Sequence, residues 1–443
     1  MLVPTRLYSL TASQVLRLLK NDTITVEQYA LSILGRIEER DSIVKAWTYL
    51  DPQLVLSQAR ALDQIPPGQR GPLHGVAVAV KDVMNTKDMP TQFGSPLYEG
   101  NQPGFDSSAV AILRYAGALI LGKTVTTEFT ATNMGPNTTN PHDPNRTPGG
   151  SSAGSAAAVA DLQVPLGLGT QTAGSLIRPA SFTGIFAMKP TFNAISTEGQ
   201  KTYSVNVDTF GFFARSMEDL QLVADIFALK DDELPSSVIL KDARVALIKT
   251  PMWDKAGPGT DAAMEKAATI LKKHGVKVEE VSFPPEYSDG KALKRMLEII
   301  ANSDAQAAFL REYRMDKTKL DPIIRGFVEN SANYTRKERV QALDRYASMR
   351  PIFDEIAADF SAIITPSVPD EAPLGLDDMG SPAFNFIWTG LHMPVIHIPA
   401  FIGAHGMPLG ISVVAGRFFD QHLLAISKAL SEPLMAEGGW KIS

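Results

Sequence analysis

Two serines that stand beside glycines are the residues of this 443-residue chain best suited to chemistry. Ser151 lies in the stretch Gly-Gly-Ser-Ser of residues 149–152, and Ser175 follows Gly174, 24 positions after Ser151. Glycine lets backbone N–H groups approach a substrate closely, and successive N–H groups in a tight turn form a site for a developing oxyanion. The two serines therefore indicate nucleophilic attack on a carbonyl group.

The segments around these serines predict how they are positioned. Residues 156–160 favour a short helix and residues 164–168 a short strand, which can return the chain to one sheet edge, so that the two serines meet. Residues 75–80 form a continuous apolar run, typical of a strand buried on both faces, and Lys81 emerges from its end. A lysine at the end of a buried strand is usually just exposed to solvent and has no catalytic role. Beside the serines it becomes a candidate base, because burial lowers the pKa of a lysine.

Together these stretches resemble the amidase signature family, the serine hydrolases with a Ser-Ser-Lys triad. Residues 71–82 resemble the lysine-bearing strand of the family and residues 390–410 its C-terminal return, whereas residues 240–355 carry little of the pattern. The resemblance implies Lys81 as the base, Ser151 as a bridging serine after a cis peptide bond, and Ser175 as the nucleophile. It also implies an oxyanion hole of backbone N–H groups and a supporting loop, formed respectively by Thr172, Ala173, Gly174 and Ser175, and by Gly149, Gly150 and Ser152.

The segment after the nucleophile departs from many family members. Gln171 stands where many have aspartate, and Arg178 comes three places after Ser175 instead of two. This spacing resembles the malonamidase-like branch, in which an arginine here helps to hold a substrate carboxylate. Arg178 could do this through two parallel hydrogen bonds, or could form a structural ion pair or clamp the backbone, and the sequence leaves these roles open. Gln171 and Trp388 are further candidates for substrate binding.

Residues 117–124 match the phosphate-loop pattern Gly-x-x-x-x-Gly-Lys-Thr. A phosphate loop needs a strand before its first glycine, but residues 109–115 predict a helix. The Ala-Leu-Ile-Leu between the glycines itself favours a strand. The context therefore argues against nucleotide binding.

Residues 150–154 also match Gly-x-Ser-x-Gly, the nucleophile elbow of α/β hydrolases. That elbow follows a buried strand directly, whereas a polar loop precedes it here. The alternative would also need a histidine base, for which His392 and His397 are candidates. Ordinary core or loop positions are the favoured interpretation of both histidines.

Composition and charge narrow the class of protein. The chain has no cysteine, which excludes disulfides, a thiol nucleophile and thiolate metal sites. Its net charge of −6 gives no indication of the clustered basic face that nucleic acid demands. The first 30 residues lack a signal-peptide layout, and no apolar run of about 18 residues suggests a membrane span. We expect a cytoplasmic enzyme that needs no metal and no organic cofactor.

The predicted fold is α/β, an amidase signature fold with a mixed central β-sheet flanked by helices. Capping boxes beginning at Thr11 and Thr25 predict two opening helices. A single domain spans residues 1–443, and a variable, mostly helical region at about 240–355 would cover the pocket.

The predicted function is that of a serine amidohydrolase working through an acyl-Ser175 intermediate. Its substrates would be small amides, aryl amides or carbamates, as in a urethanase, with esters cleaved promiscuously. The predicted partner is a small-molecule amide or carbamate, with no nucleic acid and no membrane, and a homodimer is left open. The alternative is an amidotransferase-like subunit that delivers ammonia to a partner protein.

Overall fold

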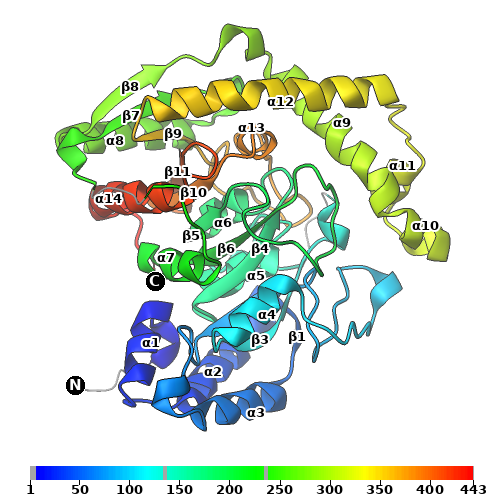
Figure 1. Cartoon of the computed structure of the whole chain (residues 1–443), viewed down its shortest axis with the longest axis vertical. Coiled ribbons are helices and arrows are strands. Elements are labelled where there is room, and N and C mark those ends of the chain that lie inside the picture. The colour runs from blue at the N-terminus through cyan, green and yellow to red at the C-terminus, as the bar shows by residue number, and fades with distance from the viewer. Residues whose placement is uncertain (1–5, 133–136, 234–237, 443) are drawn as a thin grey trace.

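A sheet of eleven strands runs through the computed structural model, which describes residues 6–132, 137–233 and 238–442 (Figure 1). The strands are β1 (Trp47–Leu50), β2 (Ala77–Lys81), β3 (Leu119–Thr124), β4 (Leu166–Gln171), β5 (Phe186–Lys189), β6 (Thr209–Ala214), β7 (Arg244–Ile248), β8 (Lys277–Val281), β9 (Ala362–Pro366), β10 (Val395–Ile402) and β11 (Pro408–Val414). Their order is β1-β3-β2-β4-β6-β5-β10-β11-β9-β7-β8. Parallel pairs around β2 and β7 flank an antiparallel centre, so the sheet is mixed, as predicted.

Helices cover both faces of the sheet. They are α1 (Ala12–Lys20), α2 (Val26–Val44), α3 (Pro52–Asp63), α4 (Ser108–Tyr115), α5 (Ala153–Ala160), α6 (Ile177–Thr183), α7 (Met217–Ile226), α8 (Pro258–Lys273), α9 (Gly290–Ala308), α10 (Leu310–Asp316), α11 (Pro322–Val328), α12 (Arg336–Ala358), α13 (Phe386–Gly390) and α14 (Asp420–Gly438). One buried cluster joins the sheet to α4, α7, α8 and α14, and a second joins it to α2, α5, α6, α12 and α13. The core therefore has two layers with the sheet between them.

The strand that carries Lys81 shows why the sheet is buried on both sides. Val78 and Val80 point into one hydrophobic cluster, and Ala77 and Ala79 point into the other. All four side chains are fully buried. Successive side chains of a strand face opposite sides, so a run without polar residues fits only between two covered faces.

Several predicted elements differ in their boundaries. Both predicted capping boxes are present, at the starts of α1 and α2. Strand β4 begins and ends later than predicted, because antiparallel pairing with β6 extends it to Gln171. The mostly helical region predicted at about 240–355 contains α8 to α12 and the strands β7 and β8. Asp321 and Thr335 are the N-cap residues at which α11 and α12 begin as separate helices.

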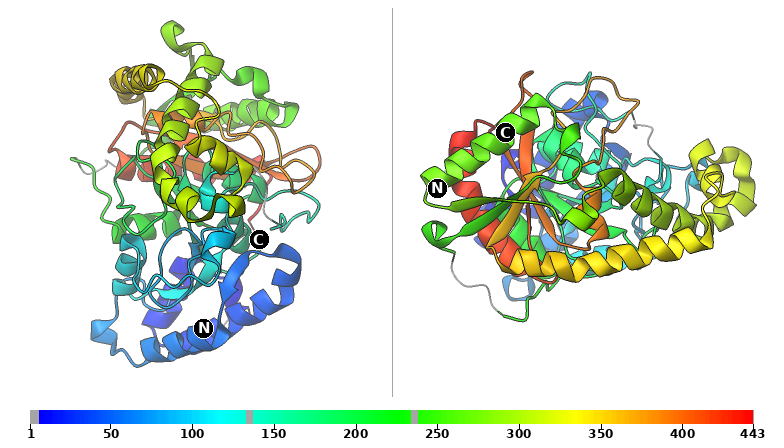
Figure 2. Two further views of the ribbon diagram at one scale, coloured as in Figure 1. Left: turned by 90° about the vertical axis from the view of Figure 1, so that its right-hand side faces the viewer. Right: turned by 90° about the horizontal axis from the view of Figure 1, so that it is seen from above.

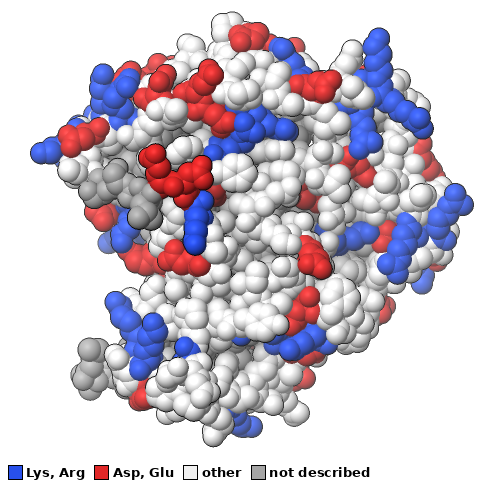
Figure 3. Space-filling model, viewed as in Figure 1, with Lys and Arg blue, Asp and Glu red and all other residues white. Residues whose placement is uncertain are grey.

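Helices α9 to α12 form an extension beside the sheet. The long α12 crosses the top of the molecule in Figure 1 and packs against α9. The left view of Figure 2 brings α10 and α11 to the front, over the middle of the molecule. On the face drawn in Figure 3, acidic and basic side chains are intermixed around a largely uncharged centre. Among the described residues, no helix has the length and apolar character needed to cross a membrane.

Candidate active site

Lys81 lies at the end of β2 and is fully buried. Its Nζ atom lies 2.8 Å from Ser151 Oγ, 2.9 Å from Ser152 Oγ and 2.8 Å from Thr170 Oγ1. Burial lowers the pKa of Lys81 well below its usual range, and the negative charge of Asp208 opposes that shift only in part. The amine is therefore surrounded by neutral hydroxyls and suited to accept a proton.

The loop that carries Ser151 has the backbone geometry that the family resemblance implies. The Gly150–Ser151 peptide bond is cis. Gly149 has a φ of 81°, and a Cβ atom there would lie 2.8 Å from Pro179 Cα. Glycine at position 149 thus allows the loop to pass close to α6.

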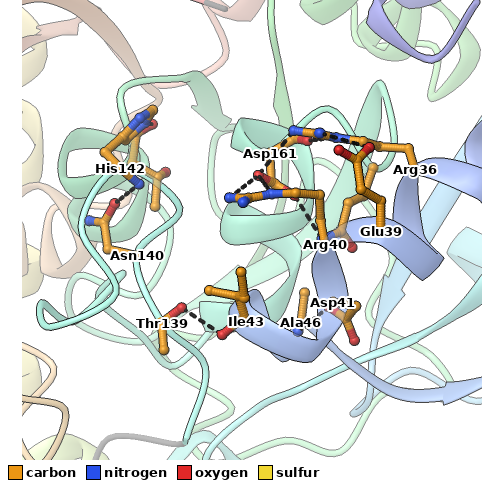
Figure 4. Close-up of polar contacts among 12 residues, drawn as sticks. Arg36, Glu39, Arg40, Asp41, Ile43, Ala46, Thr139, Asn140, His142 and Asp161 are labelled. Atoms are coloured by element: carbon orange, nitrogen blue, oxygen red, sulfur yellow. Dashed lines mark hydrogen bonds and ion pairs between the residues drawn. The ribbon is translucent and has the colours of Figure 1, made fainter.

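Helix α2 anchors both ends of this segment (Figure 4). Before the loop, Thr139 Oγ1 donates to Ile43 O at 3.0 Å. After α5, the Asp161 carboxylate accepts hydrogen bonds from Arg36 and Arg40, at 3.3 and 3.1 Å. The loop and α5 are therefore held in place by α2, through contacts between residues that lie more than 90 positions apart in the sequence.

Ser175 lies on a second braced loop, just before α6. Gln171 Oε1 accepts from Leu176 N at 2.9 Å and Ile177 N at 3.1 Å. Gln171 Nε2 donates to Thr389 Oγ1 at 3.0 Å, and that hydroxyl donates to Ala173 O at 3.0 Å. Gln171 is fully buried, so its side chain braces the loop and does not line the cavity described next.

A cavity of about 370 Å³ opens in front of Ser175. Thr172, Ala173 and Arg178 line its inner side together with Ser175. Its outer side is formed by residues of α9 and α11: Lys294, Leu297, Glu298, Ala301, Asn302, Ile323 and Phe327. Trp388 does not reach this cavity, because it is buried with its ring edge-to-face on Phe353, 6.0 Å between centroids.

Arg178 is engaged by the backbone. Its Nη2 donates to Gly150 O at 2.6 Å, and its Nη1 donates to Gly380 O. Burial lowers the pKa of Arg178 to about 10. The guanidinium therefore joins the loop of Ser151 to the loop at Gly380. These contacts are those of a backbone clamp, which is one of the roles of Arg178 that the sequence left open.

The structure joins Ser151 to Lys81 directly, whereas Ser175 stands apart from both. No hydrogen bond links Ser175 Oγ to Ser151 or Lys81, all of which lie in the described ranges. Such bonds are often long before substrate binds and tighten in the reacting complex.

The two alternative motifs have structural roles. Lys123, of the phosphate-loop pattern, is buried within β3, 3.0 Å from Asp82. His397 Nδ1 is paired with Ser367 Oγ at 2.7 Å, and burial lowers the pKa of His397 to about 3. His392 Nε2 lies 2.8 Å from Asn206 O. None of these side chains is hydrogen-bonded to either candidate serine, in the part of the chain that the structure describes.

Three residues of the site escaped the sequence analysis. Thr170 bonds Lys81, Thr389 braces the loop of Ser175, and Asp208 accepts a hydrogen bond from Thr172. Thr170 could have been noticed, because it is the second-last residue of β4, just before the loop of Ser175. Thr389 lies more than 200 residues away, and no local pattern marks it. Across the described ranges, no three His, Asp or Glu side chains gather as metal ligands.

Comparison with known proteins identifies the family. The family model described as Amidase matches residues 29–424. The chain belongs to the amidase signature family. A crystal structure described as that of an amidase shares this fold, with a TM-score of 0.85 and 27% identity over 97% of this chain and 100% of the other.

Similar curated proteins include amidotransferase subunits. A glutamyl-tRNA(Gln) amidotransferase subunit of Natranaerobius thermophilus is 28% identical, over 97% of this amidase-family chain and 96% of that protein. The subunit of the same name from Thermus thermophilus is 32% identical, over 91% and 93%. Our expectation of a small-molecule amide or carbamate as the only kind of partner is therefore wrong, because proteins named as subunits work with other proteins.

Proposed function

We propose that this chain hydrolyses an amide C–N bond through an acyl-Ser175 intermediate, as the amidase subunit of an amidotransferase that passes the released ammonia to a partner protein. The observation that carries the amidase part is the buried contact of 2.8 Å between Lys81 Nζ and Ser151 Oγ. The amidotransferase part is supported by relatives that carry this name and align along 91–97% of the chain.

In the proposed mechanism, each step of acyl transfer is assigned to a residue of the site. Neutral Lys81 accepts a proton from Ser151, Ser151 accepts one from Ser175, and Ser175 Oγ attacks the amide carbon. The C–N bond then breaks as the same relay returns the proton to the leaving nitrogen. Water hydrolyses the acyl-Ser175 ester in the second half of the reaction.

The developing oxyanion would meet backbone donors. The N–H groups of Thr172, Ala173, Gly174 and Ser175 lie on the loop that Gln171 and Thr389 brace. Preorganised donors of this kind are worth roughly 10²–10³ in rate each. We propose this loop as the oxyanion hole.

A second function, stand-alone hydrolysis of small amides, aryl amides or carbamates, remains a candidate. It is favoured by the full-length similarity to the structure described simply as an amidase. It differs from the first in that the chain itself would turn these small substrates over fast.

The two functions are separated by one assay on the purified chain. We would measure ammonia or amine release from L-glutamine, acetamide, p-nitroacetanilide and ethyl carbamate, with Ser175→Ala as the blank. A fluorophosphonate probe would report in parallel whether Ser175 is reactive. The subunit role predicts a labelled Ser175 with slow turnover of every substrate. Fast turnover of a neutral amide by the chain alone would contradict it, and an unlabelled Ser175 would contradict both functions.

A further inference from the structure

A buried carboxylate lies behind the loop that presents the candidate oxyanion donors. Asp208 Oδ1 accepts a hydrogen bond from Thr172 Oγ1 at 2.6 Å. Asp208 Oδ2 accepts from Tyr203 N at 2.6 Å and Ser204 N at 3.1 Å. With three donors the carboxylate is well satisfied, and it fixes Thr172 relative to a separate segment of the chain.

That separate segment, residues 203–208, is itself held in place. Ser204 Oγ donates to Asp304 Oδ2 at 2.6 Å, and Asn206 Nδ2 donates to the same oxygen at 2.8 Å. Asp304 belongs to α9, the helix that lines the cavity opposite Ser175. Asp208 therefore connects the loop of Ser175 to the opposite wall of the same cavity.

The charge of Asp208 also bears on Lys81. Two charged groups act on this lysine: Asp208 raises its pKa, and Arg178 lowers it. Burial raises the pKa of Asp208 itself to about 6, so the carboxylate is ionised at neutral pH. When Ser175 attacks, the relay leaves a proton on Lys81, and the negative charge of Asp208 stabilises that protonated lysine.

We propose that Asp208 is a positioning residue of this site, which orients the oxyanion loop through Thr172 and whose negative charge stabilises the protonated form of Lys81. The inference rests on the proposed function, because it assigns Asp208 a part in the same relay. It concerns a residue that does not touch substrate. Its effect must therefore appear in the pH dependence as well as in the rate.

The experiment measures the second-order rate constant of fluorophosphonate labelling between about pH 5 and pH 10. This is roughly the range in which a lysine with a lowered pKa titrates. In this reaction a bond forms between Ser175 Oγ and phosphorus, the P–F bond breaks and fluoride leaves, while the serine proton passes through Ser151 to Lys81. The variants are Asp208→Asn, Thr172→Val and Thr172→Ser, with Ser175→Ala as the unlabelled control.

Each variant has a distinct expected result. Asp208→Asn slows labelling about tenfold or more, because the oxyanion loop is misplaced. It also moves the acid limb of the pH–rate profile to lower pH, because Lys81 loses the stabilising negative charge of Asp208. Thr172→Val slows labelling but leaves the acid limb of the pH–rate profile in place, since the negative charge of Asp208 remains. Thr172→Ser keeps the hydroxyl that donates to Asp208, so it labels faster than Thr172→Val.

Two outcomes would overturn the proposal. One is an acid limb of Asp208→Asn that coincides with that of the wild type, and the other is wild-type labelling by Thr172→Val. If Asp208→Asn does not fold, as judged by thermal unfolding, the Thr172 pair still decides the positioning role. Absence of labelling in the wild type would instead count against the proposed function itself.

Discussion

A lysine serves as a base at neutral pH only when its surroundings disfavour the ammonium form. Lys81 meets this condition through complete burial, with three hydroxyl oxygens and no carboxylate at its Nζ. The direction of its pKa shift was predicted from the apolar run before it, and the structure confirms that direction. The depth of burial and the contact with Thr170 could not be predicted, because they depend on strands that are distant in sequence.

We expect Lys81→Met to slow Ser175 labelling by about 10²–10⁴, since a positioned base is worth that much, and Ser151→Ala to be nearly as harmful. Lys87→Met is the matched control, because Lys87 lies on the next loop with its side chain largely exposed. Fluorophosphonate labelling followed by intact-mass measurement checks both. Equal labelling of Lys81→Met and the wild type would remove Lys81 from the relay.

The backbone contacts of Arg178 lead to a different prediction. Arg178→Gln leaves Gly150 O without its charged donor, so we expect a loss of about 1–3 kcal/mol in the free energy of unfolding. If Arg178 is a clamp, the anionic half-amide malonamate should protect wild-type Ser175 from labelling no better than neutral malonamide does. Markedly stronger protection by malonamate would assign Arg178 to a substrate carboxylate instead.

At the scale of elements, local signals predicted the parts of the site that lie close together in sequence. The segment from Ser151 through α5 and β4 follows from small residues and glycines, and it was predicted with small errors of boundary. The braces from Thr389 and Asp208 could not be predicted. They arise from the order of strands in the sheet and from how α9 packs beside it, which no local periodicity encodes.

The ion pair of Lys123 and Asp82 is a test at this scale, because it joins the end of β3 to the residue after β2. Burial lowers the pKa of Lys123 and raises that of Asp82, so each depends on the other to remain charged. We expect Lys123→Met to lower the free energy of unfolding by about 3–5 kcal/mol, since it leaves an uncompensated buried carboxylate. Urea unfolding measures this.

The double variant Lys123→Met/Asp82→Asn is the control for that loss. It removes both charges, so it should recover part of the stability. If the single and double variants are equally unstable, packing around the lysine stem and not the buried charge explains the loss.

At the scale of the molecule, one sheet joins the first half of the chain to the second. Strands β1 to β4 meet β9 to β11 through β6 and β5. The single domain over residues 1–443 stays a prediction, and the continuous sheet supports it. The variable region at about 240–355 was expected to cover the pocket, and its helices α9 and α11 do line the cavity in front of Ser175.

Lys189, which ends β5 at the middle of this sheet, makes the stability of the whole molecule depend on pH. Its buried amine donates to Pro190 O at 3.0 Å, and burial lowers its pKa to about 7, with Asp420 acting in the opposite direction. The unfolded chain, with a lysine pKa near 10.5, binds more protons than the folded chain between about pH 7 and pH 10.5. The free energy of unfolding therefore rises with pH across that window, by at most about 1.4 kcal/mol per pH unit for one group.

Comparing the wild type with Lys189→Met isolates this contribution. The lowered pKa of Lys81 acts in the same direction in both proteins and cancels in the difference. Methionine fills a similar volume and cannot be protonated, so the variant should gain less stability between pH 7 and pH 10 than the wild type gains. Urea unfolding at several pH values in this window measures both slopes. Equal slopes would mean that Lys189 keeps its proton in the folded chain across this window, as in the unfolded chain, and that its burial does not couple the central sheet to pH.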